Sequence, residues 1–205
     1  LEKKWLPNTR PFFSSKAPLD VLTLSERKWL QNHASFSLGV DHNSYPFEFI
    51  DNNNLSGISS DYIDYISEQL NIRMNIALDN TWAQSLEKLK EGKIDIMSSM
   101  VRIDAREKSM LFTKPYFQIP SVAVTKKGTF YADSMRSFEH KKVGVIKGYV
   151  FAELIADDYP EINIVYVSSA EEGLRLLNNA EIEGYIGALP IVNHEIDKES
   201  YYNLI

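Results

Sequence analysis

The chain of 205 residues has no cysteine, so it can form neither disulfide bonds nor thiolate metal sites. It has no run of about 18 apolar residues, and its opening LEKKWLPN lacks the apolar middle of a secretion signal. We therefore expect neither a membrane-spanning helix nor a secretion signal within it. A basic face is missing too. The net charge is −6 and the lysines are dispersed, which argues against nucleic acid as a partner.

Sequence patterns for catalysis and metal binding are also missing. No G-x-S-x-G, no H-E-x-x-H and no glycine-rich phosphate loop occurs, and Glu172 and Glu183 read as surface charges. The four histidines are scattered, without the spacing of metal ligands: His33, His42, His140 and His194. We therefore expect no catalytic residue, no metal and no cofactor in this chain.

The chain does contain an alternating pattern of predicted strands and helices, and this βαβ pattern occurs twice. The first round predicts strands at 36–40, 47–50, 73–78 and 94–97, with helices at 59–70 and 82–90. The second predicts strands at 121–125, 142–146, 162–167 and 183–187, with helices at 150–157 and 170–178. Two such units, joined by hinge strands near 116–121, predict an α/β fold with lobe 1 over 36–119, lobe 2 over 120–205 and a cleft between them.

The first 35 residues do not share this pattern. PNTRPFFSSKAP carries three prolines and reads as a linker, whereas TLSERKWLQNH predicts a helix capped by Thr23 with Glu26 three residues on. A second capping box is predicted at Ser169 and Glu172. The chain stops at YYNLI as another strand-like run begins, so the segment that returns to lobe 1 is expected to be absent or truncated.

The stretch IDIMSSMVRIDAR, residues 94–106, holds the first candidate site. A short strand is followed by two serines and then by Arg106. Donors that follow a strand end in an α/β sheet point into the crevice, and a guanidinium is the planar multi-donor partner that suits a carboxylate. Taken without further context, the sequence favours a solvated loop arginine at position 106 over a cleft residue.

The order and spacing of several strings carry a family resemblance. GVDHNSYPFEFIDNNNLSGISSDYIDYISEQLNI, LEKLKEGKIDIMSSM, AREKSMLFTKPYF and KKVGVIKGYVFAELI resemble the family 3 periplasmic solute-binding proteins. LTLSERKWLQNH ahead of the first strand, GISSDY and GYV look like the Venus flytrap sensor domains of BvgS-type hybrid histidine kinases. The resemblance implies a two-lobed, type II periplasmic-binding-protein fold with a hinge and an interlobe cleft.

The resemblance also implies a ligand site, in which Arg106 grips a ligand carboxylate. Independently of it, GYVFAELI after the strand VGVI places a helix N-terminus toward the cleft, where the helix dipole attracts an anion. Departures from the family pattern shape the expected ligand. Val101 and Val150 lack the usual hydroxyls, and Ala188 replaces the aspartate that holds a ligand ammonium. Unless Asp41 or Glu48 takes the place of that aspartate, we expect the ligand to be a small organic anion rather than a standard amino acid. The candidate ligand-binding residues are Asp41, Tyr45, Ile58, Ser98, Ser99, Met100, Val101, Arg106, Gly148, Tyr149, Val150 and Ala188.

Two functions follow from the resemblance. In the first, the chain is a periplasmic sensor domain of a membrane receptor with a histidine kinase or diguanylate cyclase output. Its partners are then a small-molecule ligand, adjacent flytrap or transmembrane domains of the same chain, and a second copy through a receptor homodimer. In the second, it is a solute-binding subunit of an ABC transporter for amino acids or related molecules. The linker and the capped helix ahead of the first strand favour the sensor.

Overall fold

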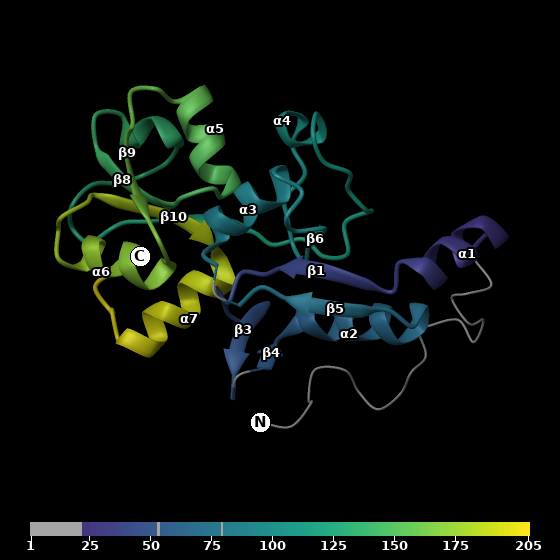
Figure 1. The fold of residues 1–205 in the computed structure, drawn as a ribbon. Coiled ribbons are helices and arrows are strands. Elements are labelled where there is room, and N and C mark those ends of the chain that lie inside the picture. Colours follow the sequence, from purple (N-terminus) through teal and green to yellow (C-terminus); the bar gives the residue numbers. More distant parts are fainter. Residues whose placement is uncertain (1–21, 53, 79) are drawn as a thin grey trace.

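The computed structural model describes residues 22–52, 54–78 and 80–205, so the predicted linker lies outside the described residues. The chain forms two α/β lobes that lie side by side (Figure 1). Lobe 1 here means the elements from β1 to α4, which α1 precedes, and lobe 2 means those from β7 to α7. No helix within the described ranges combines the length and the apolar character that a bilayer crossing requires.

Lobe 1 contains two small sheets. The parallel sheet has the strand order β5–β1–β6, and the antiparallel one has the order β2–β3–β4. Helix α1 extends from the far end of lobe 1 and has no buried residue (Figure 1). The elements are α1 Leu24–Asn32, β1 Ser35–Gly39, β2 Asn43–Ser44, β3 Glu48–Asp51, β4 Asn54–Ser56, α2 Ile58–Leu70, β5 Arg73–Ile76, α3 Trp82–Lys90, β6 Ile96–Met97 and α4 Asp104–Glu107.

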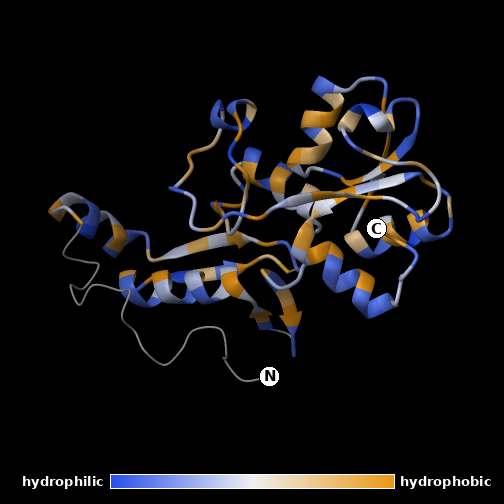
Figure 2. Cartoon of the chain, turned by 180° about the vertical axis from the view of Figure 1, so that it is seen from behind, coloured by the Kyte–Doolittle hydropathy of each residue, from blue (hydrophilic) through white to orange (hydrophobic). Residues whose placement is uncertain are grey.

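Lobe 2 is built on one four-stranded sheet with the order β7–β10–β8–β9, in which only β7 runs antiparallel to its neighbour. Its elements are β7 Ser121–Val124, a 3-10 helix Met135–Phe138, β8 Lys142–Ile146, α5 Val150–Asp158, β9 Asn163–Val167, α6 Ala170–Asn178, β10 Gly184–Ala188 and α7 Leu189–Glu199. Hydrophobic residues are frequent on α5 and on the strands, whereas α7 changes from hydrophobic at its start to hydrophilic at its end (Figure 2).

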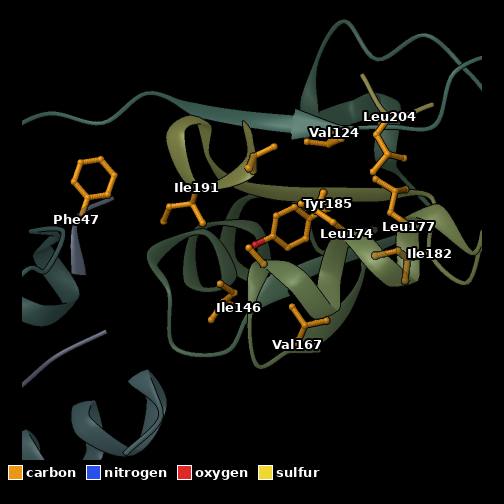
Figure 3. Close-up of a cluster of buried hydrophobic side chains, with 12 residues drawn as sticks. Phe47, Val124, Ile146, Val167, Leu174, Leu177, Ile182, Tyr185, Ile191 and Leu204 are labelled. Carbon is orange, nitrogen blue, oxygen red and sulfur yellow. The ribbon is translucent and has the colours of Figure 1, made fainter. Parts of the chain in front are cut away.

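The core of lobe 2 surrounds Tyr185, a residue of β10 that is 1% exposed. Aliphatic side chains from β8, β9, α6 and α7 lie around its ring (Figure 3). Gly173 of α6 allows this packing, because a Cβ atom there would lie 2.3 Å from the ring. The ring therefore fills the space between the sheet and α6.

Two of the helix starts are closed by complete capping boxes. The predicted box at Thr23 and Glu26 is confirmed, and Thr81 with Gln84 forms another that opens α3. At α6, Ser169 accepts from the amide of Glu172 as predicted. The Glu172 carboxylate, however, accepts from the amide and hydroxyl of Ser168 rather than from the cap residue, so this prediction is only half right.

The hinge strands predicted near 116–121 are wrong for residues 116–120, which have no regular structure. Pro115 and Pro120 lack the N–H group that a strand needs for pairing. Strand β7 begins at Ser121, and the carbonyl of Pro120 accepts from the amide of Leu189 at 2.9 Å. The connection between the lobes is therefore an irregular segment with a proline at each end.

Candidate functional site

The candidate site lies where the two lobes touch. Loops that follow β1 and β6 in lobe 1 meet the loop between β8 and α5 in lobe 2. Several polar contacts among the described residues join the lobes, of which three come from different lobe 1 side chains. The Tyr149 hydroxyl donates to Asp41 Oδ2, Trp82 Nε1–H donates to the Gly148 carbonyl at 2.9 Å, and Arg106 pairs with Glu153 at 2.7 Å. The lobes are thus held together by side chains of the chain itself.

Two buried carboxyl groups form the lobe 1 side of the interface. Glu48 is 0% exposed and Asp41 is 9% exposed. Glu48 Oε2 accepts from the amide of Asp41 at 2.7 Å. Burial raises the pKa of Asp41 to about 7, with a further contribution from the nearby charge of Glu48. Burial also raises the pKa of Glu48. The lobe 1 side of the interface therefore carries two buried carboxyl groups whose protonated form is favoured.

Hydroxyl groups surround Glu48. Those of Ser98, Ser99 and Ser59 favour its charged form and offset part of the effect of burial on its pKa. No hydrogen bond of good geometry within the described part of the chain reaches Glu48 Oε1, although the atom is buried. The Tyr116 hydroxyl donates to the Ser98 carbonyl at 2.7 Å, and burial raises its pKa to about 12. These groups form a compact polar cluster next to the connection between the lobes.

Arg106 is enclosed rather than solvated. It lies in the short helix α4 and is 5% exposed. Its Nη2 donates to Glu153 Oε1 at 2.7 Å and to the Gly148 carbonyl at 3.0 Å, its Nε donates to Glu153 Oε1 at 3.3 Å, and its Nη1 donates to the Val101 carbonyl at 3.1 Å. Each of the three guanidinium nitrogens therefore already has a partner within the protein.

Aromatic rings line the edge of the interface. Tyr45 stacks on His194 of α7 with ring centroids 4.0 Å apart, and Phe47 stacks on Phe117 at 5.1 Å. Phe47 also joins the buried cluster of lobe 2 and approaches it from the lobe 1 side (Figure 3). These stacks add apolar contact to the polar links between the lobes.

The other predicted site residues take various positions. Ile58 opens α2 and packs, like Ala188, against the apolar cluster centred on Tyr185. Val150 opens α5 and is buried, Met100 is half-buried and Val101 is 54% exposed. The structure thus brings Asp41, Tyr45, Arg106, Gly148 and Tyr149 directly to the interface. The ligand-binding role of all twelve residues stays a prediction.

Sequence reasoning missed Glu153 and His194, which both reach across the interface from lobe 2. A signal for Glu153 existed, since it lies in the first turn of the helix that follows GYV, close to the predicted anion site. A surface hollow of about 450 Å³ beside it gives solvent access to its carboxylate. No such pattern marked His194, because its contact with Tyr45 joins residues far apart in the sequence.

The described residues contain no group of three or more histidine, aspartate or glutamate side chains placed to hold a metal ion. The buried pair Asp41 and Glu48 has hydroxyl neighbours instead. The chemistry that the site offers is therefore hydrogen bonding and charge, supplied by carboxyl groups, serine and tyrosine hydroxyls and one paired guanidinium.

Trp82→Phe is expected to lower the free energy of unfolding by about 1 kcal/mol, the typical net value of one hydrogen bond. The loss stays modest because the Gly148 carbonyl keeps its bond from Arg106. Urea unfolding followed by circular dichroism measures it, and Trp29→Phe, on the unburied helix α1, is the matched control. Equal losses for the two variants would contradict a bond between the lobes.

Comparisons with known proteins bear on the family and the fold. A family model described as bacterial extracellular solute-binding proteins, family 3, matches residues 36–187. The virulence sensor protein BvgS of Bordetella pertussis is 24% identical over 177 residues, which make up 86% of this chain and 14% of BvgS. ABC transporter arginine-binding protein 1 of Escherichia coli is 27% identical over 159 residues, or 77% of this chain and 64% of that protein. The chain spans less than two thirds of either relative.

A solved structure shows the same fold. The VFT2 domain of BvgS from Bordetella pertussis superposes with a TM-score of 0.72, covering 89% of this chain and 78% of that one, at 17% identity. The predicted two-lobed Venus flytrap fold is therefore confirmed.

Proposed function

Because the chain belongs to family 3 of the bacterial extracellular solute-binding proteins, we propose that it is an extracytoplasmic ligand-sensing domain of a membrane-bound receptor. Its lobes, over 36–119 and 120–205, enclose a small organic solute, and their movement passes to the adjacent flytrap or transmembrane domains of the same chain. The output is a histidine kinase or a diguanylate cyclase, and the full-length receptor works as a homodimer. The role of this domain is binding, not catalysis.

One observation carries the proposal. The contacts between the lobes come from the same loops that the sequence predicts as the ligand site, since Asp41, Arg106, Gly148 and Tyr149 all take part. A ligand that replaces some of these contacts changes how the lobes sit against each other. The ligand shifts the equilibrium between two arrangements of the lobes, and the size of the shift is set by the difference between its affinities for the two arrangements.

The alternative is a binding subunit of an ABC transporter, favoured by the likeness to the arginine-binding protein of Escherichia coli. The helix α1, which precedes β1 and has no buried residue, supports the sensor, because it suits a connector between domains. The coding sequence that follows Ile205 separates the two. A transmembrane segment with an output domain supports the sensor, and a stop codon after one further lobe-completing segment supports the transport subunit.

A thermal-shift screen over small carboxylates, amino acids and polyamines tests for binding. A solute that binds the folded state is expected to raise the melting temperature, and the shift should grow with its concentration. The Ser99→Phe variant, which places a bulky ring beside Glu48, should lose the shift, while Tyr131→Ala, at an 86% exposed position of lobe 2, should keep it. A shift retained in Ser99→Phe would place the solute outside the cleft.

A further inference from the structure

The Arg106–Glu153 pair has an unusual place for a salt bridge. It joins the two lobes, and the Arg106 side chain is 5% exposed while that of Glu153 is 34% exposed. Two guanidinium nitrogens, Nη2 and Nε, converge on a single oxygen, Glu153 Oε1, at 2.7 and 3.3 Å. Charge-assisted contacts are stronger than hydrogen bonds between neutral groups. The pair is therefore a defined contact and not a fluctuating surface ion pair.

Glu153 also lies at a helix start. It is the fourth residue of α5, in the first turn, where the partial positive charge of a helix N-terminus favours an anion. Two groups at the interface could bind the carboxylate of a ligand, namely the Arg106 guanidinium and the positive end of α5. The carboxylate of Glu153 already interacts with both. The Gly148 carbonyl, just before α5, accepts from the same guanidinium at 3.0 Å.

We propose that Glu153 is a specificity-determining residue, a built-in carboxylate that occupies Arg106 and keeps carboxylate-bearing solutes out of this subsite. The inference rests on the proposed function, because it concerns which solutes the cleft admits. The buried carboxyl groups of Asp41 and Glu48 lie on the lobe 1 side of the interface. With Arg106 neutralised by Glu153, the native cleft suits a small neutral or cationic solute and disfavours an organic anion.

The test is a titration calorimetry series with propionate, and with propionamide as the uncharged probe of the same shape. Glu153→Ala frees the guanidinium, so it is expected to bind propionate at least about tenfold more tightly than the wild-type protein, which corresponds to about 1.4 kcal/mol. Propionamide should show no such gain. Asp157→Ala is the matched control, because it removes the same charge from an exposed position one turn further along α5.

Adding Arg106→Ala to Glu153→Ala should abolish the gain. If the single variant does not fold, Glu153→Gln gives the same comparison with the shape of the side chain preserved. Equal propionate affinity in the wild-type and Glu153 variants, or an equal gain in Asp157→Ala, overturns the proposal. This outcome is distinct from failure of the proposed function, because the titration needs no knowledge of the native solute and does not depend on the thermal-shift screen.

Discussion

Tyr185→Ala is expected to lower the free energy of unfolding by about 3–5 kcal/mol, the cost of deleting a buried aromatic ring. Tyr185 is 1% exposed, and α6 approaches its ring so closely that Gly173 has no room for a Cβ atom. Because β10 and α6 are held apart by this ring, the space left behind cannot close without moving one of them. Urea unfolding of both proteins under the same conditions measures the difference.

Tyr131→Ala is the matched control for this prediction. It makes the same substitution in the same lobe, at a position that is 86% exposed, and should change the free energy of unfolding by less than about 0.5 kcal/mol. Similar losses at the two tyrosines would mean that Tyr185 is not the centre of the core of lobe 2.

Asp41→Asn is expected to remove a pH dependence of stability. The pKa of Asp41 is about 7 in the folded protein, against an ordinary value of 3.8. Between these values the folded state keeps a proton that the unfolded state has lost, so stability falls as the pH rises through this window. From about pH 5 to about pH 7.5, the loss due to this one group amounts to about 2 kcal/mol.

Asparagine does not titrate, so the variant should lose about 2 kcal/mol less than the wild-type protein between the two pH values. Glu48 has a raised pKa of the same sign, but it is present in both proteins and its effect largely cancels in the comparison. Asp157→Asn, at an exposed position on α5, is the control and should follow the wild-type protein. Parallel stability curves for the wild-type protein and Asp41→Asn would refute the effect of burial on Asp41.

Much of the fold could be predicted from the sequence because local patterns specify it. The helices α3 and α6 and the strand β8 have the predicted bounds, since apolar periodicity and the residues at their ends agree. Helix α7 was not predicted, because Pro190 near its start and a mixed polar sequence obscure its pattern. The strands β2 and β4 are two and three residues long, too short to show an alternation.

The candidate site was predicted by position but not by chemistry. Arg106 does lie at the interface, yet its partner is Glu153, which follows it by 47 residues and belongs to the other lobe. The same holds for Asp41 and Tyr149, which are separated by 108 residues. Such pairings depend on how the lobes meet, and no local pattern in either segment encodes the partner. The sequence therefore indicated which charged and polar groups lie at the interface. It did not indicate which of these groups bind each other.

Helix α1 and the last residues of the chain are attached to different lobes. Helix α1 precedes β1 at the far end of lobe 1 (Figure 1), whereas Ile205 exchanges two backbone hydrogen bonds with Thr125 of lobe 2. The described chain passes between the lobes through the irregular segment 115–120. If lobe 1 rotated about this segment, α1 would move further than residues near the segment, because displacement grows with distance from the rotation axis. A small rotation of one lobe against the other would therefore displace α1 relative to Ile205.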